Sequence, residues 1–190
     1  MQKSAFTMVE LIFVIVIIGI LASVAIPKLS GVTDGAKKSA EIATISAVAT
    51  ALESANGEWS INEGNFTWGR NRPSSELNST TGYPNDLSAN NQIFGKLIKD
   101  SGKFKKIPSN LDDNISVFKG PASRTEIGIK PSIPDIAGKP DKNDFWIYAY
   151  NANDCNITCT NCTPKHVYYG DIVLIDVNGS DTTLPNITCN

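Results

Sequence analysis

The stretch Phe6-Thr-Met-Val-Glu10-Leu-Ile-Phe-Val-Ile-Val-Ile-Ile-Gly-Ile-Leu-Ala-Ser-Val-Ala-Ile26 decides the architecture of the N-terminal part of this chain. A helix rises about 1.5 Å per residue, so this run is about 30 Å long, which matches the hydrocarbon core of a bilayer. Glu10 is its single charge. A lone carboxylate in hydrocarbon costs roughly 2.5–3.5 kcal/mol. We therefore expect residues 6–27 to span a membrane and Glu10 to have a function that offsets this cost.

Three interpretations of this segment compete: a secretory signal peptide, a plain membrane anchor and a helix used for assembly. The sequence Ser23-Val24-Ala25 offers a small-x-small cleavage site, but the apolar run is longer than the roughly 7–15 residues of a signal peptide. The first two interpretations leave Glu10 unexplained. Lys3 and the starting amine favour a cytoplasmic N-terminus and an exported body.

The sequence Ala5-Phe6-Thr7-Met8-Val9-Glu10-Leu11 resembles the processing site of type IV pilins and type II secretion pseudopilins. The resemblance implies that a prepilin peptidase removes the leader, residues 1–5, by cutting between Ala5 and Phe6, and methylates the new Phe6 amine. The family usually has Gly before the cut, where this chain has Ala5. Glu10 lies one helical turn from Phe6. We expect Glu10 to pair with the Phe6 amine of a neighbouring subunit, and to be poorly paired in an isolated one.

The resemblance also implies a location and a set of partners. It places the chain in the bacterial inner membrane, with a cytoplasmic N-terminus and a periplasmic head, and later in a periplasmic or extracellular filament. The implied partners are other pilin or pseudopilin subunits, the prepilin peptidase, the assembly platform with its ATPase, and the lipid bilayer. The chain is then a filament subunit and not an enzyme, and it requires no cofactor.

A type II secretion pseudopilin is the favoured member of this superfamily. The sequence Asn143-Asp144-Phe145-Trp146 resembles the Asp-Pro-Trp-Gly strand entry of major pseudopilins, without its Pro and Gly. One alternative is a type IV pilin for adhesion, motility or DNA uptake. The alternative of another class is a monomeric, membrane-tethered exported domain that binds calcium or carbohydrate.

Pro27 either ends the membrane helix or kinks it. We favour a kink, because apolar residues continue at helical spacing in the soluble segment 28–56, at Ile42, Ile45, Val48 and Leu52. The other faces of this amphipathic half are expected to carry Lys37, Lys38, Glu41 and Glu53. Such a helix half can pack on a sheet.

Residues 57–190 are predicted to form one exported α+β head. A short helix is expected over 91–99, and strand formers are dense at 115–118, 126–129, 145–150 and 167–177. Trp59, Phe66 and Trp68 are expected to serve as core or subunit-contact aromatics. His166, the only histidine, is assigned a surface or packing role. With a net charge of −2, the chain has no basic field for nucleic acid.

Four cysteines crowd the C-terminal part: Cys155, Cys159, Cys162 and Cys189. A zinc site is one interpretation, but the paired C-x2-C pattern of zinc sites is incomplete here. Disulfides are favoured if the head is exported to an oxidising compartment. Of the three possible pairings, we favour one bridge inside the 155–162 loop and one from this loop to Cys189.

The segment Asp176-Val-Asn178-Gly179-Ser180-Asp181 concentrates oxygen ligands in a tight turn. One interpretation is a calcium site that uses Asp176, Asn178 and Asp181. The other is a plain Asn-Gly hairpin turn.

Five asparagines sit in the pattern acidic-x-Asn-x-Ser/Thr, whereas random order predicts about 0.3 such sites. They are Asn65, Asn78, Asn114, Asn156 and Asn178. Asn-x-Ser/Thr is an acceptor for glycosylation, and the acidic residue resembles the extended acceptor of certain bacterial N-glycosylation systems. Asn-rich loops with acidic and Ser/Thr neighbours are the alternative explanation.

Overall fold

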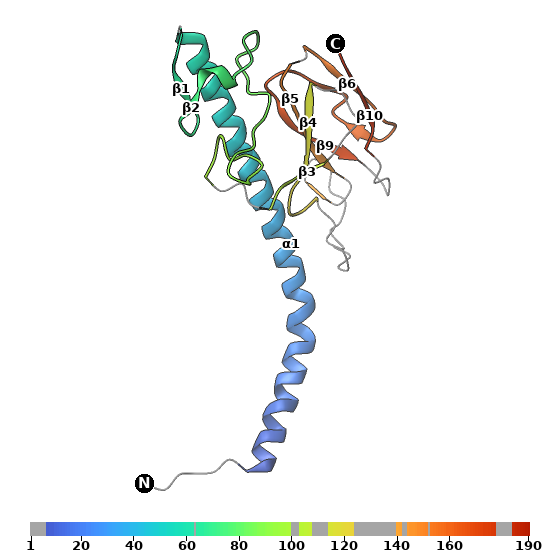
Figure 1. Ribbon diagram of the computed structural model, residues 1–190. Helices are drawn as coiled ribbons and strands as arrows, with labels where there is room; N and C mark the ends of the chain where they lie inside the picture. The colour runs from blue at the N-terminus through green and yellow to red at the C-terminus, as the bar shows by residue number, and fades with distance from the viewer. Residues whose placement is uncertain are drawn as a thin grey trace, which may run out of the picture. The chain divides into compact units, whose positions relative to one another are not determined.

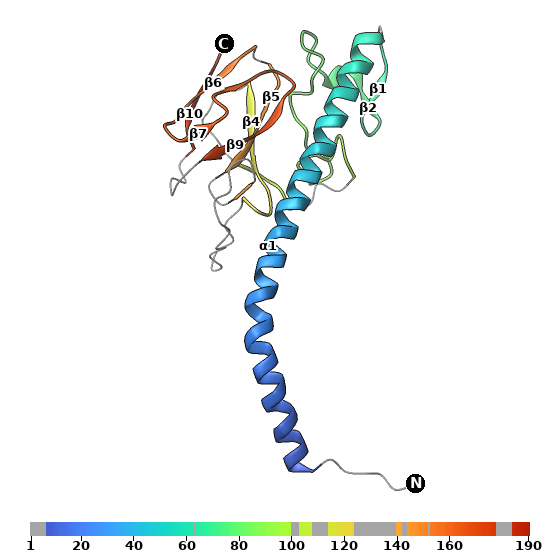
Figure 2. The ribbon, with the colours of Figure 1, turned by 180° about the vertical axis from the view of Figure 1, so that it is seen from behind.

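The computed structural model describes most of the chain (Figures 1 and 2). The described residues are 7–62, 64–99, 103–107, 114–123, 140–141, 144–151, 153–177 and 184–190. They belong to two compact units, which meet in sequence between Ala36 and Lys37.

The first unit is the N-terminal part of helix α1 (Met8–Ile61). Pro27 lies inside this helix, so the alternative of a helix end at this residue is wrong. A proline removes one backbone donor, and the surrounding run of helix-compatible apolar residues carries the helix through it. The large apolar side chains of this part are exposed, from Met8 at 82% to Val32 at 68%.

The second unit is an α+β head, which confirms the predicted fold class. The part of α1 from Lys37 onward buries one face against one side of a five-stranded sheet and the loops that precede the sheet. The other side of this sheet packs on a three-stranded sheet. Strands β4 and β5 are buried on both faces for this reason, and β5 reads as a continuous run of apolar and aromatic residues, whereas β4 also buries Ser116.

The five-stranded sheet is antiparallel throughout. Its order is β3 (Lys105–Ile107), β4 (Ile115–Lys119), β5 (Phe145–Ala149), β9 (Ile172–Val177) and β7 (Cys162–Thr163). Val117 and Ile147 face each other across the β4–β5 pair and are fully buried. The predicted strands at 115–118 and 145–150 are therefore present, whereas the predicted strand at 126–129 lies outside the described residues.

The three-stranded sheet is also antiparallel, in the order β10 (Asn186–Cys189), β6 (Cys155–Thr158) and β8 (His166–Val167). Strand β6 alternates strictly between buried and exposed residues, because one of its faces covers the core and the other faces solvent. Shorter elements after α1 are β1 (Thr67–Trp68), β2 (Arg72–Pro73) and the 3-10 helix η1 (Ser74–Glu76).

One predicted element is wrong and another is confirmed only in part. The expected helix over 91–99 is a series of turns, because Asn90 and Asn91 adopt left-handed conformations with φ of 53° and 60°. Its apolar residues still reach the core, with Phe94 fully buried. The expected strand over 167–177 is divided into β8 and β9 by a turn at Gly170, where φ is +86°.

Candidate assembly site

Helix α1 begins with a capping box formed by Thr7 and Glu10. The backbone N–H and the hydroxyl of Thr7 each donate to Oε2 of Glu10 at 2.8 Å. The N–H of Glu10 donates in return to Oγ1 of Thr7 at 3.3 Å. In a Thr-x-x-Glu pattern, this exchange satisfies donors that the helix itself leaves free. The expectation that an isolated subunit leaves Glu10 poorly paired therefore needs correction, because Thr7 is an internal partner.

The helix that follows this cap has no protein covering it in the first unit. Its most apolar window has a mean hydropathy of 3.0 and is 0% buried. By length and composition it is able to cross a membrane. Large side chains such as Ile12, Phe13 and Ile20 are more than half exposed, so this surface needs lipid or other helices around it. Ala5 and Phe6, the expected processing residues, lie outside the described residues.

Within the head, Glu41 joins α1 to the sheet and is 0% exposed. Its Oε1 accepts the indole N–H of Trp146 at 2.7 Å and the hydroxyl of Ser123 at 2.8 Å. Its Oε2 accepts the N–H groups of Ala122 at 2.6 Å and Ser123 at 3.2 Å. A Cβ on Gly120 would lie 2.3 Å from Cδ of Glu41, so only glycine fits there without a shift. Glu41 thus connects the helix to β5 and to the turn after β4.

The prediction that Lys38 and Glu41 face solvent is wrong. The buried stripe of α1 in the head includes Glu41, Ile45, Val48, Leu52 and Ala55, at spacings of four and three residues. Lys38 is 8% exposed, whereas Ile42, an expected core residue, is 38% exposed. The spacing of Glu41 from Ile45 already placed it on the apolar stripe, but a charged residue is normally assigned to the surface. Its burial is explained by the four donors around its carboxylate.

A second buried carboxylate lies where the chain enters β5. Asp144 accepts the N–H of Val177 at 2.8 Å and the N–H of Asp141 at 2.9 Å, which joins the start of β5 to the end of β9. Burial, together with the nearby charges of Asp141 and Asp176, raises the pKa of Asp144 to about 7, although the hydrogen bonds from the N–H groups of Val177 and Asp141 act in the opposite direction. Asp144 is part of the expected pseudopilin-like strand entry, and its structural role is to fix this corner of the sheet.

The four cysteines form two disulfides, Cys155–Cys189 and Cys159–Cys162. Cys155 and Cys189 face each other across the β6–β10 pair, so this bridge holds the last strand to the sheet. The second bridge closes the turn between β6 and β7. This agrees with the favoured pairing, and it supports disulfides over the alternative of a zinc site, since no cysteine among the described residues is free.

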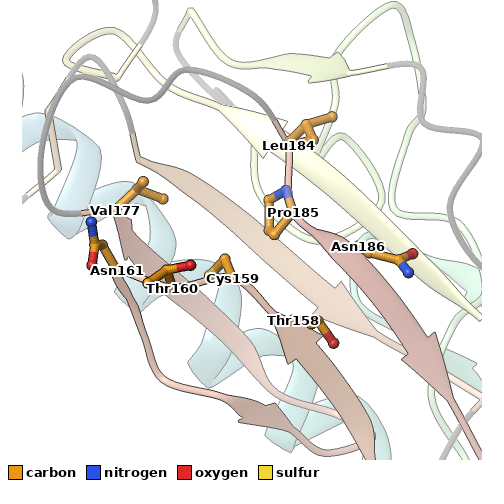
Figure 3. Close-up of a pocket in the computed structure, with 8 residues that line it drawn as sticks. All are labelled: Thr158, Cys159, Thr160, Asn161, Val177, Leu184, Pro185 and Asn186. Carbon is orange, nitrogen blue, oxygen red and sulfur yellow. The ribbon is translucent and has the colours of Figure 1, made fainter.

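A pocket of about 310 Å³ lies beside Cys159, between the turn after β6 and the segment that leads into β10 (Figure 3). Its described lining carries hydroxyl, amide and apolar groups: Thr158, Cys159, Thr160, Asn161, Val177, Leu184, Pro185 and Asn186. These groups include no general acid or base, since the Cys159 sulfur is already in a disulfide.

Of the expected calcium ligands, only Asp176 is described. It lies in β9 and is 7% exposed, while Asn178 and Asp181 lie outside the described residues. Within the described ranges, no three His, Cys, Asp or Glu residues are grouped so that they could hold a metal ion. Calcium binding by residues 176–181 stays a prediction.

The candidate glycosylation sites differ in their surroundings. Asn65 and Asn156 are exposed, the latter on the solvent face of β6. Asn78 and Asn114 are each hydrogen bonded to Asn151, at 2.8 Å and 2.9 Å, so their side-chain amides hold loops together. Asn178 lies outside the described residues. Glycosylation stays a prediction, and we expect it first at the two exposed sites.

Comparison with known proteins bears directly on the N-terminal residues. Residues 1–26 match the family model for the prokaryotic N-terminal methylation motif. The chain carries a prepilin-type signal. This motif marks precursors of type IV pilins and pseudopilins, and it supports a pilin-like structural subunit that is processed by prepilin peptidase and assembles with other pilin subunits. No curated protein and no solved structure matches the chain.

The prepilin-type signal and the structure together define the candidate assembly site as Thr7, Glu10 and the apolar surface of α1. Thr7 was not expected to take part. The pattern Thr-x-x-Glu before an apolar run is itself an N-terminal helix signal, so the sequence did contain the information. His166, for which a surface or packing role was expected, is exposed on β8 and lies 3.1 Å from the Asp154 carboxylate.

Proposed function

We propose that this chain is a pseudopilin of a type II secretion-type system, a structural subunit of a pilus-like filament. The observation that carries the proposal is Glu10. It is the single charge in the apolar run of residues 6–26, inside the matched methylation motif. A carboxylate at such a depth is costly and calls for a partner of opposite charge.

The proposed mechanism depends on Phe6 and Glu10, which are one helical turn apart in the sequence. Cleavage between Ala5 and Phe6 creates a methylated amine on Phe6, which is a cation next to the membrane. In a filament, this amine pairs with Glu10 of the adjacent subunit, which cancels both charges in a low dielectric and sets the axial stagger between subunits. Thr7 keeps Glu10 hydrogen bonded while the subunit is stored in the bilayer.

During assembly, helices of other subunits replace the lipid around the apolar part of α1. Small residues along the helix, Gly19 and Ser23, allow a close approach between helices. An inner-membrane assembly platform and its ATPase supply the work of extraction. The head, whose C-terminal strand is held by the Cys155–Cys189 disulfide, faces the periplasm. The strand entry at Asp144–Trp146 and the oxygen-rich sequence of residues 176–181 support a pseudopilin rather than a surface pilin.

The test uses Glu10→Gln in the native host, with Ser23→Ala as the control on the same helix. Glutamine keeps an oxygen that can accept the Thr7 hydrogen bonds but carries no charge. We expect Glu10→Gln to insert into the membrane, to be cut after Ala5, and to form no filaments in electron micrographs of sheared cells. Ser23→Ala should assemble, since the Ser23 hydroxyl donates only to Ile20 of its own helix.

Filaments formed by Glu10→Gln would refute the charge pairing. Intact-mass analysis of the wild-type protein provides the second readout: a chain that begins with methylated Phe6 supports the proposal, and an uncut Met1 would indicate a membrane-tethered monomer instead. The same spectrum reports added sugars. Loss of protein secretion in a deletion strain distinguishes a pseudopilin from a pilin for adhesion, motility or DNA uptake.

A further inference from the structure

A groove of about 260 Å³ lies on the head, where four segments distant in sequence meet. They are the end of α1, the turn before Tyr83, the loop before β6 and the turn between β8 and β9. The residues that line the groove are Asn56, Trp59, Thr80, Thr81, Asn153 and Tyr169. Two aromatic rings, two amides and two hydroxyls thus share one small concave site without a charged side chain.

The aromatic walls of the groove are fixed in place by glycines. Gly82 has a φ of +71°, and a Cβ there would lie 2.4 Å from the Trp59 ring, so the indole rests directly on the backbone. Tyr169 packs against Tyr83, with ring centroids 6.1 Å apart. Tyr83 in turn covers Gly170, where a Cβ would lie 2.3 Å from its ring. Both ring positions are therefore set before any ligand arrives.

The polar wall is equally ordered. The side-chain Oδ1 of Asn78 accepts the N–H groups of Thr80 at 2.8 Å and Thr81 at 3.1 Å, which fixes the turn. Asn56 donates to the Thr81 carbonyl at 2.9 Å. Within the described part of the chain, the Oδ1 of Asn56, the Thr80 hydroxyl and the side-chain amide of Asn153 make no protein hydrogen bond. These groups remain able to donate to or accept from a ligand.

We propose that this groove binds a neutral saccharide, with one sugar ring seated between Trp59 and Tyr169. A pyranose has an apolar C–H face that packs on an aromatic ring and a rim of hydroxyls that exchange hydrogen bonds with amides and hydroxyls. A phosphorylated or acidic ligand would find no cation among the lining residues. The volume lies just below the range of about 300–1,000 Å³ for drug-sized ligands, which suits a single ring or the end of a glycan.

The groove therefore adds a recognition function to the head of a filament subunit. It uses residues that neither the prepilin-type signal nor the membrane helix involves. A site that holds one sugar is expected to bind with a Kd on the order of millimolar, and many copies along a filament would raise the avidity.

The test is saturation-transfer NMR on the full chain in lauryldimethylamine oxide micelles, a detergent without a sugar headgroup. The probes are methyl β-glucoside, methyl β-galactoside and N-acetylglucosamine, with sorbitol as the acyclic control. We expect at least one of the cyclic sugars to receive saturation and sorbitol to receive none. No transfer to any of the three sugars at a concentration of tens of millimolar would overturn the proposal.

A matched pair of variants locates the binding. Tyr169→Ala removes one wall of the groove and should weaken binding about tenfold. Tyr168→Ala, at a neighbouring residue that is 54% exposed and does not line the groove, should leave binding unchanged. Asn153→Ala removes a polar group from an exposed loop and should weaken binding while the melting temperature stays the same. Equal binding by the two tyrosine variants, or equal loss in both, would overturn the assignment.

Discussion

Replacing Glu41 with alanine is expected to destabilise the head more than any substitution of an exposed acid on the same helix. The change removes a fully buried carboxylate that accepts four hydrogen bonds. It leaves the Trp146 indole N–H and the backbone N–H groups of Ala122 and Ser123 without an acceptor in the core. Each unsatisfied buried donor costs about 1–3 kcal/mol, and these costs are not additive.

The expected total follows from the donors that lose their acceptor. Three buried N–H groups at about 1–3 kcal/mol each, taken as less than additive, predict about 4 kcal/mol for Glu41→Ala. For a domain of this size, 1 kcal/mol corresponds to about 2–4 °C, which predicts a fall in melting temperature of about 8–16 °C. Glu41→Gln keeps the volume and one acceptor oxygen, so about half of this loss is expected.

The assay is denaturant unfolding of the full chain in micelles, followed by tryptophan fluorescence, because the Trp146 ring leaves the core on unfolding. Glu53→Ala is the control, since Glu53 is an exposed acid on the same helix and its loss should change stability by less than about 0.5 kcal/mol. A Glu41→Ala protein within 1 kcal/mol of the Glu53→Ala control would refute the reasoning that this carboxylate attaches α1 to the sheet.

Three further predictions concern the same head. Gly120→Ala should unfold at lower denaturant than wild type, because its Cβ would lie 2.3 Å from the Glu41 side chain; an unchanged midpoint would contradict this packing. Replacing Cys155 and Cys189 with serines should lower the free energy of unfolding by about 4 kcal/mol, because the bridge closes a loop with a sequence separation of 34. A smaller loss of stability than on removal of the Cys159–Cys162 bridge would contradict this expectation. In EDTA, the contribution of Asp144 to stability should be largest near pH 4 and should fall by at most about 4 kcal/mol as the pH rises to 7. The reason is that folded Asp144 keeps its proton up to a pKa of about 7, whereas in the unfolded chain this carboxyl loses its proton near the ordinary pKa of 3.8. Asp144→Asn should flatten this slope, and an unchanged slope would show that other groups cause it.

Much of the architecture could be predicted from local patterns. The membrane-length helix follows from an uninterrupted apolar run, and strands β4 and β5 follow from dense β-branched and aromatic residues. The α+β class follows from the order of these elements. The favoured disulfide pairing agrees with the structure, because Cys159 and Cys162 are close in sequence and only Cys189 lies far away.

The failures arose where a local preference was overridden by distant contacts. The segment 91–99 has helical spacing of apolar residues, yet left-handed Asn90 and Asn91 and the burial of Phe94 keep it in turns. The strand expected over 167–177 is broken because Gly170 fits beneath the ring of Tyr83, a residue far away in the sequence. Neither contact can be inferred from a short window of sequence.

The sequence by itself determined the prepilin-type signal, the membrane-length helix, the lone carboxylate at Glu10 and the fold class, because each depends on residues that are neighbours along the chain. Only the tertiary structure decided that Glu41 is buried and that Trp59 and Tyr169 line one groove. Both results need partners brought together from distant segments: a buried carboxylate is stable only when donors surround it, and a groove exists only where its walls meet.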